Sequence, residues 1–247
     1  MVVNLENSPG NDTRRRVTVD CVRTDSSTWT RDRLQRLIER PLRNPALEKI
    51  EERRRALATL PPLTLHPSYV GKNAYAGQPF VSPKTISLPR RYGRILYSIA
   101  AEIRPRWTLE AGAGLGLSGM YLGAASALLR AGCLVSFEIS DYCRIAEESI
   151  RITFPQAQVH QDDFDNFHRY LDPMTEVDLC FLDSKHDKDT ILRNYKSVLG
   201  WMSPRGALLI DDVMSTPGSR AAWEHILQRG DFAFVACIQN RIGFLAR

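Results

Sequence analysis

Long apolar runs are absent from this chain of 247 residues. No stretch approaches the roughly 20 apolar residues that a membrane-spanning helix needs. The first residues, MVVNLENSPGNDTRRR, also lack the apolar core of a secretory signal peptide. We therefore expect a soluble protein that resides in the cytoplasm and has no membrane partner.

Cysteine is scarce, and its spacing excludes two common classes of small site. The sequence has five cysteines, an odd number, and they are widely spaced without any C-x-x-C pair. This pattern indicates neither a disulfide framework nor a zinc site. We interpret all five as buried or free thiols: Cys21, Cys133, Cys143, Cys180 and Cys237.

A strong excess of one charge is also missing from most of the chain. Residues 1–60 carry 13 Lys or Arg and 9 Asp or Glu, which leaves 20 and 19 for the remainder. Arginine triplets at 14–16 and 53–55 could contact RNA, but no aromatic residues alternate with them as in a face that binds single strands. Such charge runs are usually solvated surface, so an RNA-binding module is a minor alternative.

Composition divides the chain into three parts. We expect a flexible polar arm over 1–28, N-terminal helices with a pocket-lining loop over 29–87, and an α/β domain over 88–247. In the second part, helical spacing over 30–58 is broken by Pro41 and Pro45, which predicts two short helices.

The third part alternates short apolar runs with helical segments, beginning with a helix near 89–103. Such alternation predicts a parallel sheet with right-handed crossovers. The last two runs are separated only by QNR, too short for a crossover, so they should form an antiparallel hairpin at the sheet edge. The predicted fold is α/β, a Rossmann-like doubly wound sheet of seven strands with an N-terminal helical extension. The strand candidates are WTLEA, CLVSFE, AQVH, VDLCFLD, ALLIDD, FAFVACI and IGFLAR.

A glycine-rich turn joins the first of these strands to a helix. The stretch TLEAGAGLGLSGMYLGAA (108–125) has glycines at 112, 114 and 116, which let a ligand approach the backbone closely. A nicotinamide-dependent oxidoreductase would need G-x-G-x-x-G, and Leu117 interrupts that spacing. A phosphate-binding P-loop is excluded because no G-K-[ST] follows.

Acidic residues close three consecutive strands: Glu110, then Glu138, then Asp162 with Asp163. Each alone is an ordinary polar strand terminus. Together they lie at the carboxyl ends of strands, where open α/β sheets bind their ligands.

With LEAGAGLG, FEIS, QDDF and the terminal hairpin, residues 80–247 resemble the class I S-adenosylmethionine-dependent methyltransferases. The resemblance implies that the glycine turn holds the methionine end of the cofactor, that Glu138 binds the ribose hydroxyls, and that Asp162 or Asp163 lies beside adenine. The cofactor-binding residues implied are Glu110, Ala111, Gly112, Gly114, Ser118, Glu138, Ile139, Asp162 and Asp163.

A second group of carboxylates follows the next two strands. Asp183 and Asp211 are 28 residues apart with one helix between them, and Asp212 follows directly. Adjacent parallel strands end at the same edge of a sheet, so these three side chains should converge. Three carboxylates together need a cation or protons, and hard oxygen ligands suit Mg²⁺, with Mn²⁺ or Ca²⁺ as substitutes.

The same residues resemble the metal-dependent O-methyltransferases. Those of the catechol type carry D-x-x-K at the fourth strand end, whereas here His186 stands three residues after Asp183, with Lys185 beside it. D-x-x-H followed by D-D is similar instead to the methyltransferases that act on sugar hydroxyls of macrolide antibiotics. That likeness implies His186 as general base, Asp183 and Lys185 as further catalytic residues, and Asp183, Asp211 and Asp212 as metal ligands.

The sequence thus predicts an O-methyltransferase that uses S-adenosylmethionine and Mg²⁺ on a hydroxyl of a small natural product, sugar or catechol-like diol. Helix capping is the common explanation for any one of these acids taken alone, so a metal-independent methyltransferase on another acceptor stays open. Related enzymes often use their N-terminal helices for dimer contacts or as a lid, so the resemblance leaves a homodimer open without deciding the oligomeric state.

Overall fold

The structure is a computed structural model that describes residues 17–67 and 79–247. Most of the predicted flexible arm, the arginine triplet at 14–16 and part of the pocket-lining loop, with Tyr69 and Tyr75, lie outside the described residues.

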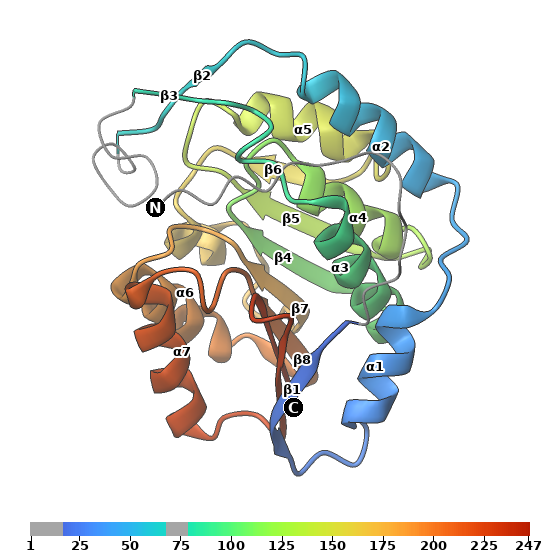
Figure 1. The fold of residues 1–247 in the computed structure, drawn as a ribbon, viewed down its shortest axis with the longest axis vertical. Coiled ribbons are helices and arrows are strands. Elements are labelled where there is room, and N and C mark those ends of the chain that lie inside the picture. Colours follow the sequence, from blue (N-terminus) through green and yellow to red (C-terminus); the bar gives the residue numbers. More distant parts are fainter. Residues whose placement is uncertain (1–16, 68–78) are drawn as a thin grey trace.

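An eight-stranded sheet with helices on both faces forms the centre of the molecule (Figure 1), which confirms the predicted Rossmann-like α/β fold. Its order is β1-β9-β10-β8-β7-β4-β5-β6, and the five strands from β8 to β6 are parallel to one another. The strands are β1 (Val19–Thr24), β4 (Trp107–Ala111), β5 (Cys133–Phe137), β6 (Gln158–His160), β7 (Val177–Leu182), β8 (Met202–Ile210), β9 (Phe234–Ile238) and β10 (Ile242–Ala246), with β2 (Leu63–Thr64) and β3 (Phe80–Val81) paired separately.

The helices divide between two apolar clusters, one on each face of the sheet. The first cluster packs under α1, α2, α3, α4 and α5, and the second under η2, α6 and α7. All seven strands expected from the sequence are present. The helices are α1 (Arg31–Glu39), α2 (Ala46–Leu57), α3 (Arg90–Ile103), α4 (Leu117–Ser126), α5 (Cys143–Arg151), the 3₁₀ helix η2 (Phe164–Arg169), α6 (Lys188–Leu199) and α7 (Pro217–Arg229).

The eighth strand, β1, corrects the prediction of a flexible arm over 1–28. Val19–Thr24 pairs antiparallel with β9, so the β9–β10 hairpin lies inside the sheet rather than at its edge. The sequence concealed β1 for two reasons. A bulge between Cys21 and Arg23 interrupts its alternation, and its partner strand lies more than 200 residues further along the chain.

The N-terminal helices pack on the domain as the sequence predicts. Leu34 of α1 and Ile50 of α2 are fully buried in the first cluster. The second arginine triplet is partly engaged in this packing, because Arg53 donates to Ser149 Oγ (2.9 Å) and Arg54 pairs with Glu51 (3.1 Å). Two of the three arginines of this triplet are therefore engaged in contacts within the fold.

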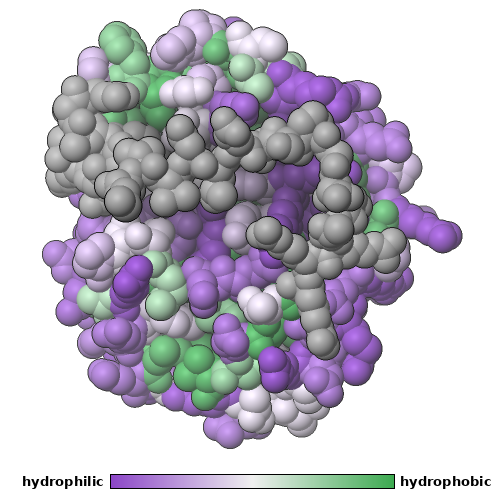
Figure 2. Space-filling view, viewed as in Figure 1, coloured by the Kyte–Doolittle hydropathy of each residue, from purple (hydrophilic) through white to green (hydrophobic). Residues whose placement is uncertain are grey.

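The polarity of the surface and the state of the cysteines agree with what the composition predicts. Within the described residues, no helix combines the length and the apolar character that crossing a bilayer requires. Figure 2 shows a largely hydrophilic face on which hydrophobic residues form small separate groups. All five cysteines are free, and three of them are buried.

The glycine turn after β4 packs directly on the end of β7. Gly112 has φ +84°, and a Cβ atom there would lie 2.1 Å from the carbonyl oxygen of Asp183. The backbone N–H of Asp183 donates to the carbonyl of Ala111 (2.8 Å). Only glycine permits both this left-handed backbone and this approach, so Gly112 fixes the two strand ends against each other.

Glu110, the acid that closes β4, is fully buried beneath α4. Its Oε2 accepts a hydrogen bond from Ser136 Oγ (2.6 Å), and Gly119 of α4 packs against the same oxygen. Burial raises the pKa of Glu110 to about 7, against the lowering effect of the Ser118 and Ser136 hydroxyls and with a smaller rise from Glu138. The carboxyl is therefore easily protonated near neutral pH.

This burial predicts a pH-dependent stability. Because the folded pKa lies above the ordinary value of 4.5, the contribution of Glu110 is fully present below that value and is lost as pH rises through about 7. As the pH is raised from acidic to mildly alkaline, the free energy of unfolding of wild type should fall by on the order of 3 kcal/mol relative to that of Glu110→Gln. Urea unfolding at both pH values measures this. Glu148→Gln, on the exposed part of α5, is the control, and an E110Q difference independent of pH would contradict the assignment.

The contact at Gly112 predicts a second stability effect. Gly112→Ala should cost roughly 2 kcal/mol or more, because the new methyl group meets backbone atoms and φ becomes strained. Gly200→Ala is the matched control, since a Cβ atom there meets nothing within 4 Å. Thermal unfolding of both variants compares them, and equal melting temperatures would show that the strand ends tolerate separation.

Candidate active site

A cavity of about 310 Å³ opens at the carboxyl ends of β4, β5, β7 and β8. This volume lies in the range of about 300–1,000 Å³ that is common for small-molecule sites. The cavity combines the glycine turn, the acid after β5, the 84–89 segment and part of the second carboxylate group. Its polar and glycine lining comprises Lys84, Thr85, Ser87, Gly112, Gly114, Ser118, Glu138, Tyr142, Asp183, Ser184, His186, Asp212 and Arg241.

On one side of the cavity, Glu138 is held by backbone and hydroxyl donors. Its Oε2 accepts from the backbone N–H of Gly114 (2.7 Å), and its Oε1 accepts from the N–H (2.9 Å) and the Oγ (2.6 Å) of Ser140. A Cβ atom at Gly114 would meet only one atom, the carbonyl oxygen of Ile86 at 3.9 Å, so the turn leaves open space. A carboxylate and an open glycine backbone thus face the same cavity.

The structure brings together some of the predicted cofactor residues and separates others. Gly112, Gly114, Ser118 and Glu138 line the cavity. Glu110 and Ala111 are buried in β4, and Ile139 is 40% exposed. None of these three, nor Asp162 or Asp163, is among the lining residues.

Asp162 and Asp163 make local bonds after β6. Asp162 accepts from Asn166 Nδ2 (2.8 Å) and from the Tyr170 hydroxyl (2.8 Å), and these bonds lower its pKa. Asp163 caps η2 by accepting from the N–H of Asp165 (3.0 Å). Capping of this kind is what a single strand-end acid most often does.

On the other side of the cavity lie the second carboxylates, which do converge. His186 Nε2 is 3.1 Å from Asp183 Oδ1, and its Nδ1 is 3.7 Å from Asp212 Oδ2. Asp211 is 1% exposed and lies behind the others. The three acidic side chains therefore converge, as predicted from the ends of adjacent parallel strands.

Arg241, in the tight turn between β9 and β10, pairs with these acids. Its Nε and Nη2 donate to the two oxygens of Asp211 at 2.9 and 2.6 Å, and its Nε lies 3.2 Å from Asp212 Oδ1. Its guanidinium carbon lies 4.5 Å from the ring centroid of Tyr92 on α3. Such a bidentate, stacked geometry suits arginine and no other cation.

The prediction from the sequence did not include Arg241, because the segment QNR (239–241) was considered only as a short connection between the last two strands. Gln239 and Asn240 both have positive φ, as in the tight turns of β-hairpins. The turn carries Arg241 across from the end of β9 to the end of β8, where the backbone N–H of Val213 donates to its carbonyl (2.9 Å). The sequence did contain one signal for Arg241, because a basic residue stands in a turn at the ligand-binding edge of the predicted sheet.

Burial and charge shift the protonation of this cluster. Burial lowers the pKa of His186, but Asp183, Asp212 and Asp211 outweigh it and raise the pKa to about 9. Burial and the charge of Asp211 raise the pKa of Asp183 to about 7, against His186 and Arg241. Burial, followed by Asp211, raises the pKa of Asp212.

The side chains as they lie do not fit the divalent metal that the sequence predicts. Arg241 takes both oxygens of Asp211 and approaches one of Asp212, while His186 approaches one of Asp183. Across residues 17–67 and 79–247, no group of three or more His, Cys, Asp or Glu side chains has an arrangement able to hold a metal ion. In this cluster Arg241 occupies carboxylate oxygens that a metal ion would need, and the prediction from the strand ends did not include Arg241.

Lys185 lies beside the cluster. Its Nζ is 3.0 Å from Asp187 Oδ2, and it is not among the residues that line the cavity. Asp187 also caps α6 by accepting from the N–H of Thr190 (3.0 Å).

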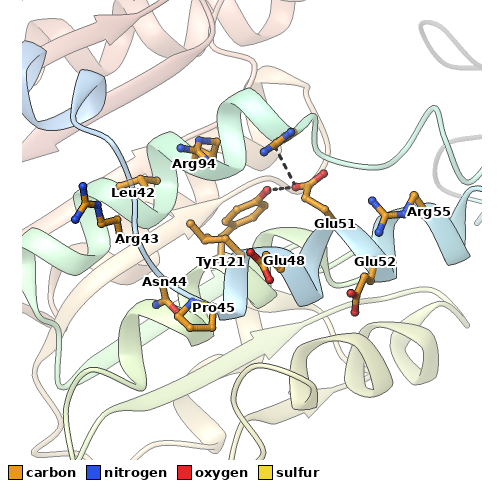
Figure 3. Close-up of a pocket in the computed structure, with 12 residues that line it drawn as sticks. Leu42, Arg43, Asn44, Pro45, Glu48, Glu51, Glu52, Arg55, Arg94 and Tyr121 are labelled. Carbon is orange, nitrogen blue, oxygen red and sulfur yellow. Dashed lines mark hydrogen bonds and ion pairs between the residues drawn. The ribbon is translucent and has the colours of Figure 1, made fainter. Parts of the chain in front are cut away.

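A second cavity, of about 770 Å³, lies between α2 and α3 (Figure 3). Glu51 projects into it and accepts a hydrogen bond from the Tyr121 hydroxyl (2.6 Å). Two further acids, Glu48 and Glu52, and four arginines, Arg43, Arg55, Arg90 and Arg94, also line it, and none of the predicted site residues does.

Comparison with known proteins agrees with this geometry. Residues 109–213 match the family model described as a methyltransferase domain. This segment runs from β4 to the residue after the Asp211–Asp212 pair, so it contains the glycine turn and both carboxylate groups. A search of curated proteins by sequence found no match.

Solved methyltransferases share the fold. The methyltransferase PaMTH1 of Podospora anserina, bound to S-adenosylhomocysteine, is similar with a TM-score of 0.60 at 17% identity, over 87% of this chain and 94% of that one. The O-methyltransferase TomG of Streptomyces achromogenes, bound to S-adenosylmethionine, gives 0.57 at 18%, over 83% and 91%. An O-methyltransferase of Bacillus cereus, bound to S-adenosylhomocysteine, gives 0.55 at 18%, over 89% and 99%.

Both comparisons agree with the expectation from the glycine turn and the ordered strand-end acids. Residues 109–213 therefore form a methyltransferase domain, and the described chain has the fold of methyltransferases that bind S-adenosylmethionine or S-adenosylhomocysteine.

Proposed function

We propose that this protein transfers a methyl group from S-adenosylmethionine to a hydroxyl oxygen of a small molecule. One observation carries the proposal: the open glycine turn, the carboxylate of Glu138 and the imidazole of His186 line a single cavity. A cofactor held by the first two would present its methyl group toward the third. The names of the O-methyltransferases with the same fold favour oxygen as the acceptor atom.

The residues present fit the cofactor. The open space at Gly114 would admit its amino-acid end, and the carboxylate of Glu138 would accept hydrogen bonds from its ribose hydroxyls. Ser140 and Gly114 already donate to Glu138, which fixes the direction of its oxygens. When bound, the cofactor supplies a sulfonium methyl group that is already activated for attack.

The chain has two tasks in such a reaction: it orients the acceptor oxygen in line with the methyl carbon, and it takes up a proton. The oxygen forms the new bond to carbon, the carbon–sulfur bond breaks with its electron pair moving to sulfur, and the hydroxyl proton goes to a base. We assign the base to His186, the imidazole of the cavity.

Two carboxylates lie near His186, at different distances from its two ring nitrogens. Asp183 lies within hydrogen-bond distance of Nε2, so it holds the ring in place. Asp212 lies 3.7 Å from Nδ1, beyond hydrogen-bond distance, which leaves Nδ1 as the nitrogen that receives the proton. Asp183 then acts as a positioning residue for the base.

Some expectations are not carried into this proposal. Because Arg241 holds the carboxylates, neither a magnesium ion nor metal ligation by Asp183, Asp211 and Asp212 is included. A catalytic Lys185, adenine contacts from Asp162, Asp163 or Ile139, a homodimer and cytoplasmic residence stay predictions. The acceptor stays at the level of a small molecule with a reactive hydroxyl, such as a sugar or a diol of a natural product.

Cofactor binding tests the proposal first. Calorimetric titration with S-adenosylhomocysteine should show one site, and Glu138→Ala should weaken binding by roughly 10- to 100-fold, since two or more charge-assisted hydrogen bonds are lost. Glu148→Ala, on the exposed face of α5, is the matched control and should bind as wild type does. Binding of NAD(H) without binding of S-adenosylhomocysteine would instead reveal an oxidoreductase.

The raised pKa of His186 predicts an alkaline activity profile. A base works only when deprotonated, so kcat/KM should rise with pH, with a midpoint near pH 9, and level off above it. His186→Ala should lower turnover by about 10²- to 10⁴-fold and abolish that rise. The readout is S-adenosylhomocysteine formed across pH with a panel of hydroxyl acceptors, and exposed His168→Ala is the control. A rise centred near pH 7 in both wild type and H186A would move the base to Asp183.

A further inference from the structure

We propose that Arg241 is the built-in cation of this site, occupying the place that a divalent metal would take, so that the methyl transfer needs no metal. The part of this inference that concerns methyl transfer rests on the proposed function. The part that concerns the exclusion of a metal ion by Arg241 does not. It depends on the position of one guanidinium group among three carboxylates.

Burial makes Asp211 dependent on Arg241. Asp211 is 1% exposed, and a buried carboxylate without a partner is strongly unfavourable. Arg241 satisfies both of its oxygens with two hydrogen bonds in the parallel fork geometry. A metal ion could bind Asp211 only by displacing this fork.

The fixed charge of Arg241 also opposes a metal ion at this position. Arginine keeps its positive charge at any pH a protein tolerates. Its Nε lies 3.2 Å from Asp212 Oδ1, and the neighbouring acids, Asp183 among them, raise its pKa further. A dication placed beside the same carboxylates would meet this fixed charge at short range, where repulsion is weakly screened.

The guanidinium of Arg241 is rigidly placed. Tyr92 of α3 stacks on it at 4.5 Å, and the carbonyl of Arg241 accepts from the N–H of Val213 just after β8. Two elements from distant parts of the chain therefore fix one side chain. Such fixing is expected of a group that must orient a reactant without reorganising.

Arg241 also has one donor available for a ligand. Nε and Nη2 are used by Asp211 and Asp212, whereas Nη1 makes no hydrogen bond to any residue in the described part of the chain. Arg241 lines the same cavity as His186. Nη1 is thus the donor that can hold an oxygen of the acceptor while His186 takes the proton.

A consequence for the acceptor follows. A metal orients its substrate by chelation, which favours two adjacent oxygens, whereas one guanidinium N–H needs only a single oxygen. The acceptor class therefore extends from vicinal diols to molecules with one reactive hydroxyl.

Manganese binding tests this inference without any need for activity. Mn²⁺ in water gives a six-line electron paramagnetic resonance signal that is lost on binding to protein. We expect wild type to leave the signal unchanged at millimolar Mn²⁺, and Arg241→Gln to bind one Mn²⁺ at least about tenfold more tightly than wild type, because three carboxylates are then uncompensated. Thermal unfolding reports whether the variant is folded.

Two further variants sharpen the result. Arg241→Lys keeps the charge and should still exclude Mn²⁺, whereas Arg247→Gln, on the same hairpin with hydrogen bonds to backbone carbonyls, should behave as wild type. Tight binding of one Mn²⁺ by wild type, lost in Asp183→Asn, overturns the inference. So does a folded R241Q that gains no Mn²⁺ site. The wild-type signal decides the question even if R241Q fails to fold.

Turnover gives a second, separate readout. With any acceptor that the protein methylates, EDTA should leave the wild-type rate unchanged; loss of activity in EDTA and its return with Mg²⁺ would overturn the inference. Absence of all methyl transfer, with normal exclusion of Mn²⁺, would instead count against the proposed function alone.

Discussion

The ion pair between Arg241 and Asp211 is the interaction on which the arrangement of the site depends. A carboxylate that is 1% exposed at the end of β8 requires a partner that supplies charge and two aligned donors. Arg241 can do so only if β10 lies directly beside β8, which is the pairing observed. The same contact places a fixed positive charge among the carboxylates and leaves Asp183 to hold His186.

A close backbone contact joins this cluster to the cofactor side. Gly112 lies against the carbonyl of Asp183, so the glycine turn and the proposed base are held at one fixed separation. Methyl transfer depends on in-line geometry over short distances, and a rigid contact between strand ends favours it. The residues proposed to bind the cofactor and the residue proposed as base thus follow adjacent strands of one sheet.

Local patterns in the sequence predicted much of this. The alternation of apolar runs and helical segments gave seven of the eight strands, and the spacing of Asp183 and Asp211 predicted their convergence. β1 was missed because its bulge breaks the period of two. Asp162 and Asp163 were grouped with the cofactor acids, yet their side chains turn to neighbours only a few residues away.

The sequence by itself determined which residues stand at the ligand-binding edge, because strand order along the chain and the rule for parallel crossovers fix where strand ends lie. Only the tertiary structure decided what those residues do there. It buried Glu110 under α4 and exposed Glu138 to the cavity, although both close a strand. It also brought Arg241 to the acids that the sequence had assigned to a metal. Side-chain direction and ion pairing depend on packing between segments far apart in the chain, and no local pattern records them.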